Sequence, residues 1–127
     1  MDEAATRAFA KRFFDAIEQG DVAAVRDSYT PDVGIWHNFD DKVQTREENV
    51  ATLTAMVARI GERSYDERRV EVFDGGFLQQ HVLRGTRKDG SRVSLPACII
   101  CRMRDGKIAR LDEYLDSAHV ALFRQTF

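Results

Sequence analysis

Four titratable side chains stand out, because each could transfer protons if it lay in a pocket. His37 lies in the segment WHN, His81 in QQHVL, and Glu113 and Asp116 in the closing segment DEYLD. An imidazole beside a buried carboxylate forms an acid–base pair whose protonation depends on burial and on the partner. A lone histidine at a strand end is, however, more often a structural residue than a catalyst.

The first elements that must position these groups are helices. Apolar residues recur at helical spacing, and capping residues or glycine mark the ends. The predicted helices cover residues 3–19, 21–29 and 45–60. The third opens at a capping box formed by Thr45 and Glu48. Its buried face carries Leu53 and Val57, which we expect to line a ligand pocket.

The remainder of the chain alternates as β-strands do. Glycine-containing turns separate the apolar runs, which is typical of antiparallel hairpins. The predicted strands are 33–38, 65–74, 77–87, 92–103 and 107–116. The order of elements predicts an α+β fold, with three N-terminal helices packed on one face of a curved antiparallel sheet. We expect a single domain spanning residues 1–127.

The types of turn predict which side chains lie opposite one another on neighbouring strands. The odd-numbered residues of 92–103 are apolar, so we expect this face to be interior. If the loop RDG holds Gly106 in the left-handed conformation and adds a bulge, Ala97 pairs with Glu113. If the loop KDG has the same form, His81 pairs with Ala97. A two-residue loop at Gly75-Gly76 would pair Val70 with His81 and Val72 with Gln79, which also turns inward.

These pairings would set His81, Ala97 and Glu113 in one row across three strands. Neighbouring strands lie ~4.8 Å apart, so the small Ala97 leaves a gap that the other two side chains could bridge. Two alternatives stay open. A slip of one residue in the loop KDG would turn His81 outward. An interior Glu113 could instead pair with an arginine, such as Arg84 or Arg110.

The segment WHN belongs to the first predicted strand. Alternation places His37 on one face of this strand and both Trp36 and Asn38 on the other. We interpret WHN as a wall of the pocket and the following FDD, residues 39–41, as its solvated exit turn.

Composition excludes several classes of protein. The formal net charge is −2, and hydrophobic residues make up 43% of the chain. Arginines and lysines are scattered, which argues against nucleic-acid binding. We expect no membrane segment and no signal peptide, and therefore a cytoplasmic protein.

The two cysteines, Cys98 and Cys101, lie in a strand pattern. A redox-active CxxC motif normally opens a helix instead, so we interpret both as packing residues. Three scattered histidines match no common zinc spacing. We expect neither a metal nor another cofactor.

The segments FFDAIEQGDVAAVRDSYTPDV, GTRKDG and RDGKIARLDEYLD resemble the nuclear transport factor 2-like superfamily across nearly the whole chain. Within it the chain looks most similar to SnoaL-type polyketide cyclases and ketosteroid isomerases. The resemblance implies a cone-shaped fold whose curved sheet and helices, packed on its concave face, enclose one apolar pocket. It also implies a homodimer.

The resemblance carries over unevenly to the functional positions. His37 matches the position of the carboxylate base of the steroid isomerases, whereas Phe13 and Ile99 replace their two oxyanion-hole donors. Because neither replacement can donate a hydrogen bond, steroid isomerisation is disfavoured. Asp116 matches the C-terminal base of SnoaL-like cyclases, and Tyr114 lies on the same strand face. The Asp–Arg–Asp set of limonene epoxide hydrolases has no clear counterpart.

We therefore predict a pocket enzyme that performs cofactor-free acid–base chemistry on a small, largely apolar molecule. His37 and His81 would transfer protons, Glu113 would orient His81, and Asp116 would be an alternative base. The expected ligand pocket includes Trp36, Asn38, Tyr114, Phe13, Gln79, Ala97, Ile99, Leu53 and Val57. The competing class is a non-catalytic ligand carrier or dimerisation module, because a fold does not fix a function.

Overall fold

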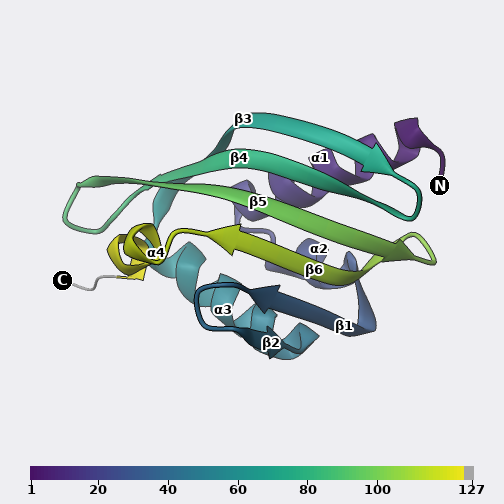
Figure 1. The fold of residues 1–127 in the computed structure, drawn as a ribbon. Coiled ribbons are helices and arrows are strands. Elements are labelled where there is room, and N and C mark those ends of the chain that lie inside the picture. Colours follow the sequence, from purple (N-terminus) through teal and green to yellow (C-terminus); the bar gives the residue numbers. More distant parts are fainter. Residues whose placement is uncertain (125–127) are drawn as a thin grey trace.

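The computed structural model describes residues 1–124 as one curved sheet with helices packed against its inner side (Figure 1). The α+β class predicted from the sequence is confirmed. In chain order the elements are α1 (Glu3–Gln19), α2 (Val22–Asp27), β1 (Tyr29–His37), β2 (Lys42–Gln44), α3 (Arg46–Arg59), β3 (Gly61–Phe73), β4 (Gly76–Thr86), β5 (Arg92–Arg104), β6 (Lys107–Leu115) and α4 (Ser117–Arg124).

The sheet has the strand order β2-β1-β6-β5-β4-β3. All neighbouring strands are antiparallel except β1 and β6, which run parallel. The expectation of a purely antiparallel sheet is wrong at this one junction. Side-chain alternation indicates which face of the sheet a residue occupies, but not whether a partner strand that is distant in sequence runs parallel. Because β2, α3 and the strands β3 to β5 separate β1 from β6 in the chain, no hairpin turn indicates how these two strands pair.

The helix boundaries follow from local capping. The carboxylate of Asp2 accepts a hydrogen bond from Ala5 N at 2.7 Å at the start of α1, and Gly20 ends that helix with φ of 74°. The predicted capping box opens α3. The second helix is shorter than predicted, because Tyr29 already belongs to β1. No helix was predicted from the sequence over the residues of α4.

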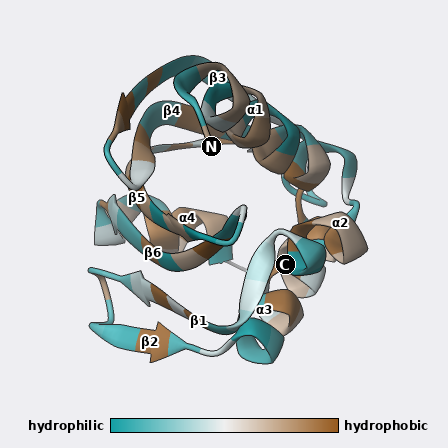
Figure 2. Cartoon of the chain, turned by 90° about the vertical axis from the view of Figure 1, so that its right-hand side faces the viewer, coloured by the Kyte–Doolittle hydropathy of each residue, from teal (hydrophilic) through white to brown (hydrophobic). Residues whose placement is uncertain are grey.

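The core fills the concave side of the sheet. Phe13 and Phe14 of α1 are almost fully buried, and Phe14 packs edge-on against both Tyr65 and His81. Figure 2 shows the sheet curling from β3 to β2 around this interior, with α1 and α3 on the opposite side. None of the helices in the described part of the chain is long and apolar enough to cross a membrane.

The β4–β5 hairpin has the predicted register. Arg87 N donates to Ser91 O at 2.9 Å, Gly90 has φ of 87°, and His81 pairs with Ala97. The three-residue loop KDG and the inward orientation of His81 are therefore confirmed.

The β3–β4 hairpin differs from its prediction. Its turn is Asp74-Gly75, so Val70 pairs with Gln79 rather than with His81. The predicted register of this hairpin is therefore wrong by two residues. Since strand faces alternate every residue, the predicted inward face of Gln79 is nevertheless correct.

The β5–β6 hairpin differs in a way that relocates the candidate site. Asp105 and Gly106 both have positive φ, which makes a two-residue turn, and the extra residue lies at Ala109 instead. Burial supports this bulge, because Ile108 and Leu111, three residues apart, are both buried. As a result Glu113 pairs with Ile99, and its predicted pairing with Ala97 is wrong.

Candidate functional site

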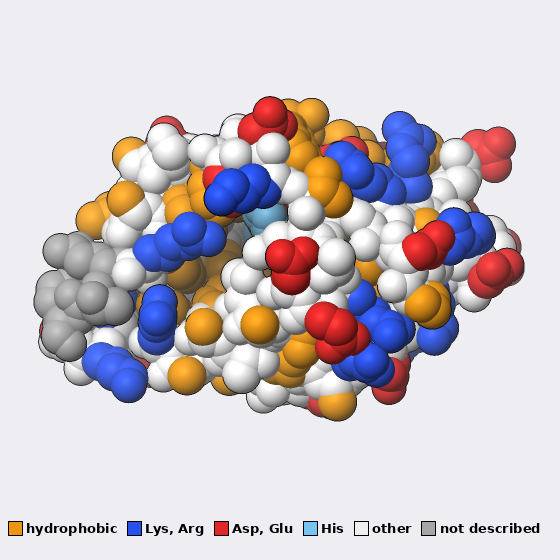
Figure 3. Space-filling model, turned by 90° about the horizontal axis from the view of Figure 1, so that it is seen from below, with side chains coloured by type: hydrophobic (Ala, Val, Ile, Leu, Met, Phe, Trp, Pro, Cys, Tyr) orange, Lys and Arg blue, Asp and Glu red, His pale blue; other side chains and the backbone are white. Residues whose placement is uncertain are grey.

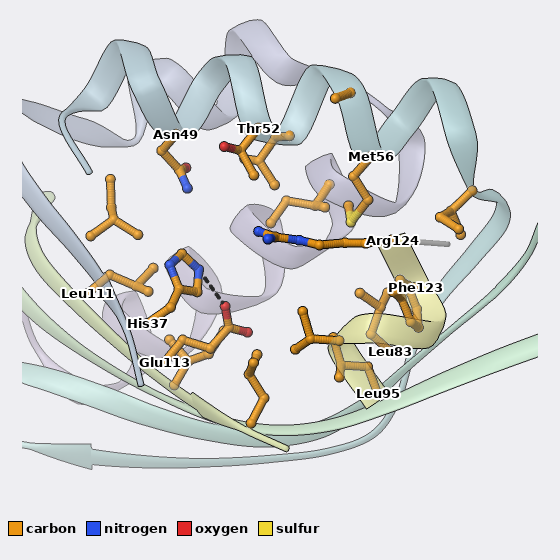
Figure 4. Close-up of a pocket in the computed structure, with 18 of the residues that line it drawn as sticks. His37, Asn49, Thr52, Met56, Leu83, Leu95, Leu111, Glu113, Phe123 and Arg124 are labelled. Carbon is orange, nitrogen blue, oxygen red and sulfur yellow. Dashed lines mark ion pairs between the residues drawn. The ribbon is translucent and has the colours of Figure 1, made fainter. Parts of the chain in front are cut away.

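A cavity of about 370 Å³ lies between α3, the inner face of the sheet and α4. Its size falls within the range of small-molecule sites, and its wall is mainly apolar. Figure 4 shows α3 on one side of the cavity and the strands that carry His37 and Glu113 on the other. Seen from below in Figure 3, the surface is hollowed, with a histidine side chain visible inside and basic side chains close by.

His37 and Glu113 meet inside this cavity. Nε2 of His37 lies 3.0 Å from Oε1 of Glu113, and the two side chains are only 14% and 18% exposed. The dashed line in Figure 4 marks this contact. Nδ1 of the imidazole accepts no hydrogen bond from any described residue. With Nε2–H donating to the carboxylate, the lone pair of Nδ1 is available to a ligand.

The parallel junction of β1 and β6 produces this pair. His37 and Glu113 are register partners, and Asn38 N donates to the Glu113 carbonyl at 3.1 Å just beyond the end of β1. The bulge at Ala109 brings the glutamate onto the inner face at this level of the sheet. The pair therefore depends on two features of β6 that side-chain alternation does not report.

His81 does not contact Glu113, so the predicted dyad is wrong. It lies in the core, 4% exposed, between the rings of Phe14 and Tyr65. Its Nδ1 is 2.9 Å from Nε2 of Gln79, whereas its Nε2 is buried without a partner. Burial lowers the pKa of His81 from 6.5 to about 4, and the more distant Glu113 charge only partly opposes this shift.

The other predicted pocket residues divide into two groups. Phe13, Leu53 and Ile99 line the cavity. Trp36 and Tyr114 do not, because their rings pack together on the outer face of the sheet, where Tyr114 is 47% exposed.

Gln79, Ala97 and Val57 are also absent from the cavity wall. Gln79 is fully buried beside His81, and Ala97 lies between His81 and Leu115 in the register. Val57 instead packs beside Gly20 at the end of α1.

Asp116 and Asn38 have local structural roles. The Asp116 carboxylate is exposed and accepts a hydrogen bond from Ala118 N at 2.8 Å at the start of α4. The Asn38 side chain accepts from Leu115 N at 2.9 Å. Neither side chain lines the cavity, which argues against Asp116 as a base for a ligand bound there.

Sequence reasoning missed several residues of the cavity wall. Asn49 and Thr52 reach it from α3, Phe39 from the turn after β1, and Arg124 from α4. A signal for α4 did exist, since Asp116 precedes a run with Val120 and Phe123 at helical spacing. In residues 1–124 no group of three or more histidine, cysteine, aspartate or glutamate side chains could hold a metal ion.

The model of the SnoaL-like domain family matches residues 10–111. The chain belongs to this family. Among curated proteins, none matches the sequence significantly.

Solved structures with the same fold carry several different names. A candidate polyketide cyclase from Xanthomonas campestris is 19% identical, with a TM-score of 0.81 over 92% of this chain and 94% of its own. AclR, a candidate hydroxylase from Streptomyces galilaeus, is 13% identical, with a TM-score of 0.85 over 95% and 96%. An LEH-like epoxide hydrolase from M. tuberculosis is 18% identical, with a TM-score of 0.77 over 94% and 87%.

At these identities the solved structures establish the fold and no particular reaction. Their names cover cyclase, hydroxylase and epoxide hydrolase. The activity of this SnoaL-like chain must therefore be argued from its own cavity.

Proposed function

We propose that this SnoaL-like protein is an enzyme that moves a proton on a small, largely apolar substrate, without a cofactor. The observation that carries the proposal is the contact between His37 Nε2 and Glu113 Oε1 at the wall of an apolar cavity. In this proposal Nδ1 of His37 is the general base, and Glu113 fixes the tautomer and stabilises the imidazolium that forms.

The surroundings suit this role. Ile35, Leu111 and Leu115 line the cavity near the pair, so a bound ligand would displace water from it. In such a site a fixed carboxylate stabilises a developing positive charge more strongly than it would in water. The same imidazole can return the proton to another atom of the substrate, which is the step shared by isomerases, cyclases and lyases.

A generic probe can test proton abstraction while the natural substrate is unidentified. In a nitrobenzisoxazole, removal of the ring C–H proton breaks the N–O bond and gives a nitrile and a coloured phenolate. We expect the protein to accelerate this reaction above the rate with free imidazole, and His37→Gln to lower the rate ~10²–10⁴-fold. A parent rate no higher than that of His37→Gln would refute the proposal.

The alternative is a non-catalytic carrier that uses the same cavity. It predicts binding of apolar ligands with equal affinity in the parent and in His37→Gln, and no turnover in either. Measuring affinity and rate on the same samples separates the two functions.

We also propose that the protein forms a homodimer through the outer face of its sheet. The outer face of the sheet carries Leu78, Val82, Cys98 and Ile100, all partly exposed, next to the Trp36–Tyr114 ring pair. A contiguous apolar face of this kind is rarely left in water. Sedimentation at micromolar concentration should give twice the 14.5 kDa of one chain. A Leu78→Lys/Ile100→Lys variant should sediment as a monomer, and a parent that sediments at 14.5 kDa would contradict the dimer.

A further inference from the structure

The cavity wall also carries a cation that has no acidic partner among the described residues. Arg124, the last described residue of α4, lines the cavity and makes no ion pair with any residue from 1 to 124. Its guanidinium carbon lies 4.8 Å from the centre of the Phe39 ring. Figure 4 shows the side chain extending from α4 into the space between α3 and the His37–Glu113 pair.

The contact with the Phe39 ring holds the Arg124 guanidinium in place, and none of its donors has a hydrogen-bond partner among residues 1–124. A guanidinium carries five N–H donors in a fixed planar arrangement. These donors have the geometry that matches the two oxygens of a carboxylate. Arg59, at the end of α3, also lines the cavity, so the wall has two guanidinium groups and a single carboxylate, Glu113.

A chain of hydrogen bonds supplies a second donor on α3. Tyr29 and Asn49 share a bond of 2.8 Å, Asn49 and Gln44 one of 3.0 Å, and Gln44 and Thr52 one of 2.9 Å. Tyr29 is buried, and burial raises its pKa well above the ordinary value, so the phenol keeps its proton.

The direction of this chain follows from the buried phenol. Among the described residues, the Tyr29 hydroxyl has only Asn49 as an acceptor, and a buried hydroxyl left without one is costly. The Tyr29 proton therefore points to Asn49 Oδ1, and the amide of Gln44 must donate to Thr52 Oγ1. Because Oγ1 is already an acceptor, the proton of the Thr52 hydroxyl is left to donate to a ligand in the cavity.

We infer that the ligand carries a carboxylate, which Arg124 binds with the Thr52 hydroxyl as a second donor. This inference rests on the proposed function of the cavity and adds that its ligand carries an acid group. The Glu113 carboxylate repels an anion, so the acid group of the ligand lies at Arg124 and Thr52, and its apolar body fills the rest of the cavity.

Matched ligands test this inference without requiring turnover. Naphthoate and naphthamide have almost the same shape and differ in charge. By calorimetry we expect the parent to bind naphthoate at least ~10-fold more tightly, because hydrogen bonds to charged groups are stronger than those to neutral groups. Arg124→Gln should abolish this preference, and Thr52→Val should weaken naphthoate binding more than naphthamide binding and so reduce it.

Arg12→Gln is the control for net charge, because Arg12 is exposed on α1, outside the cavity wall. It should keep the full preference for naphthoate. Equal binding of the two ligands by the parent, binding of neither, or a preference that survives in Arg124→Gln would overturn the inference. A carboxylate preference without nitrobenzisoxazole turnover would instead overturn the enzymatic proposal alone.

Discussion

His37 and His81 both lie on the inner side of the same sheet, and each has a polar neighbour at about the same distance. His37 faces the carboxylate of Glu113 at 3.0 Å, and His81 faces the amide of Gln79 at 2.9 Å. They differ in surroundings. His37 borders a cavity, whereas His81 is enclosed by Phe14 and Tyr65.

This difference determines what each imidazole can do. An amide cannot balance the charge of an imidazolium, and burial has lowered the pKa of His81 to about 4, so this ring stays neutral near pH 7. His37 has a carboxylate partner instead of an amide, and it borders a cavity that a ligand can enter. Burial and a polar contact together therefore do not make a histidine catalytic, because the charge of the partner and access to a ligand also matter.

The largest expected effect is on the reaction rate, from replacing Glu113, the acidic partner of His37. Glu113→Gln keeps the shape of the side chain but removes the charge that stabilises a protonated His37, so we expect the nitrobenzisoxazole rate to fall on the order of 10²–10⁴-fold. Gln79→Met is the matched control in the same row of the sheet and should leave the rate unchanged. A loss in both variants would mean that the rate follows general damage to the sheet.

The next effect is on the pH dependence of stability. The folded-state pKa of His81 is about 4, below its ordinary value of 6.5. The unfolded chain therefore binds more protons between these values, and stability that is complete above pH 6.5 is lost as the pH falls toward 4. Between pH 7 and 5 we expect a loss of about 2 kcal/mol in the free energy of unfolding from this group.

Urea unfolding at the two pH values measures this loss. His81→Gln should lose less stability between them than the parent does. An unchanged pH dependence in His81→Gln would show that the buried histidine is not the group responsible.

The smallest effect concerns the unpartnered atoms beside His81. Gln79 Oε1 and His81 Nε2 are both buried without a hydrogen bond. Replacing the pair with apolar groups, as in Gln79→Leu/His81→Phe, removes this cost and should raise stability at pH 7 by about 1 kcal/mol. The single variant His81→Phe should gain less, because the Gln79 amide then loses its one partner. A double variant that is less stable than the parent would show that these two atoms do not destabilise the folded protein.

The sequence predicted which residues face inward better than which residues meet. Alternation placed Gln79, His81 and Glu113 on the inner face, and the loop KDG fixed the partner of His81 correctly. The extra residue of the next hairpin lies at Ala109 instead of in its turn. Both positions preserve the face of Glu113 but differ by two residues in register, so the local pattern could not distinguish them.

Contacts across long sequence separations were harder to predict. His37 and Glu113 are brought together by a parallel pairing, and no turn joins these two strands to report their register. Trp36 and Tyr114 were expected near the ligand, although alternation put Trp36 on the face opposite His37. The structure follows the alternation. Arg124 lies at the end of α4, and only Val120 and Phe123 at helical spacing after Asp116 indicate this helix in the sequence.

The bulge at Ala109 has a consequence for how such a site can change during evolution. If the same residues formed a regular ladder without this bulge, Glu113 would pair with Cys98 and turn outward, and Tyr114 would turn inward. Loss of the Ala109 codon, in contrast, would leave Glu113 opposite Ile99 on a regular ladder, so the acid–base pair could survive it. In alignments of related chains, the placement of gaps in this segment therefore matters as much as the identity of the aligned acid.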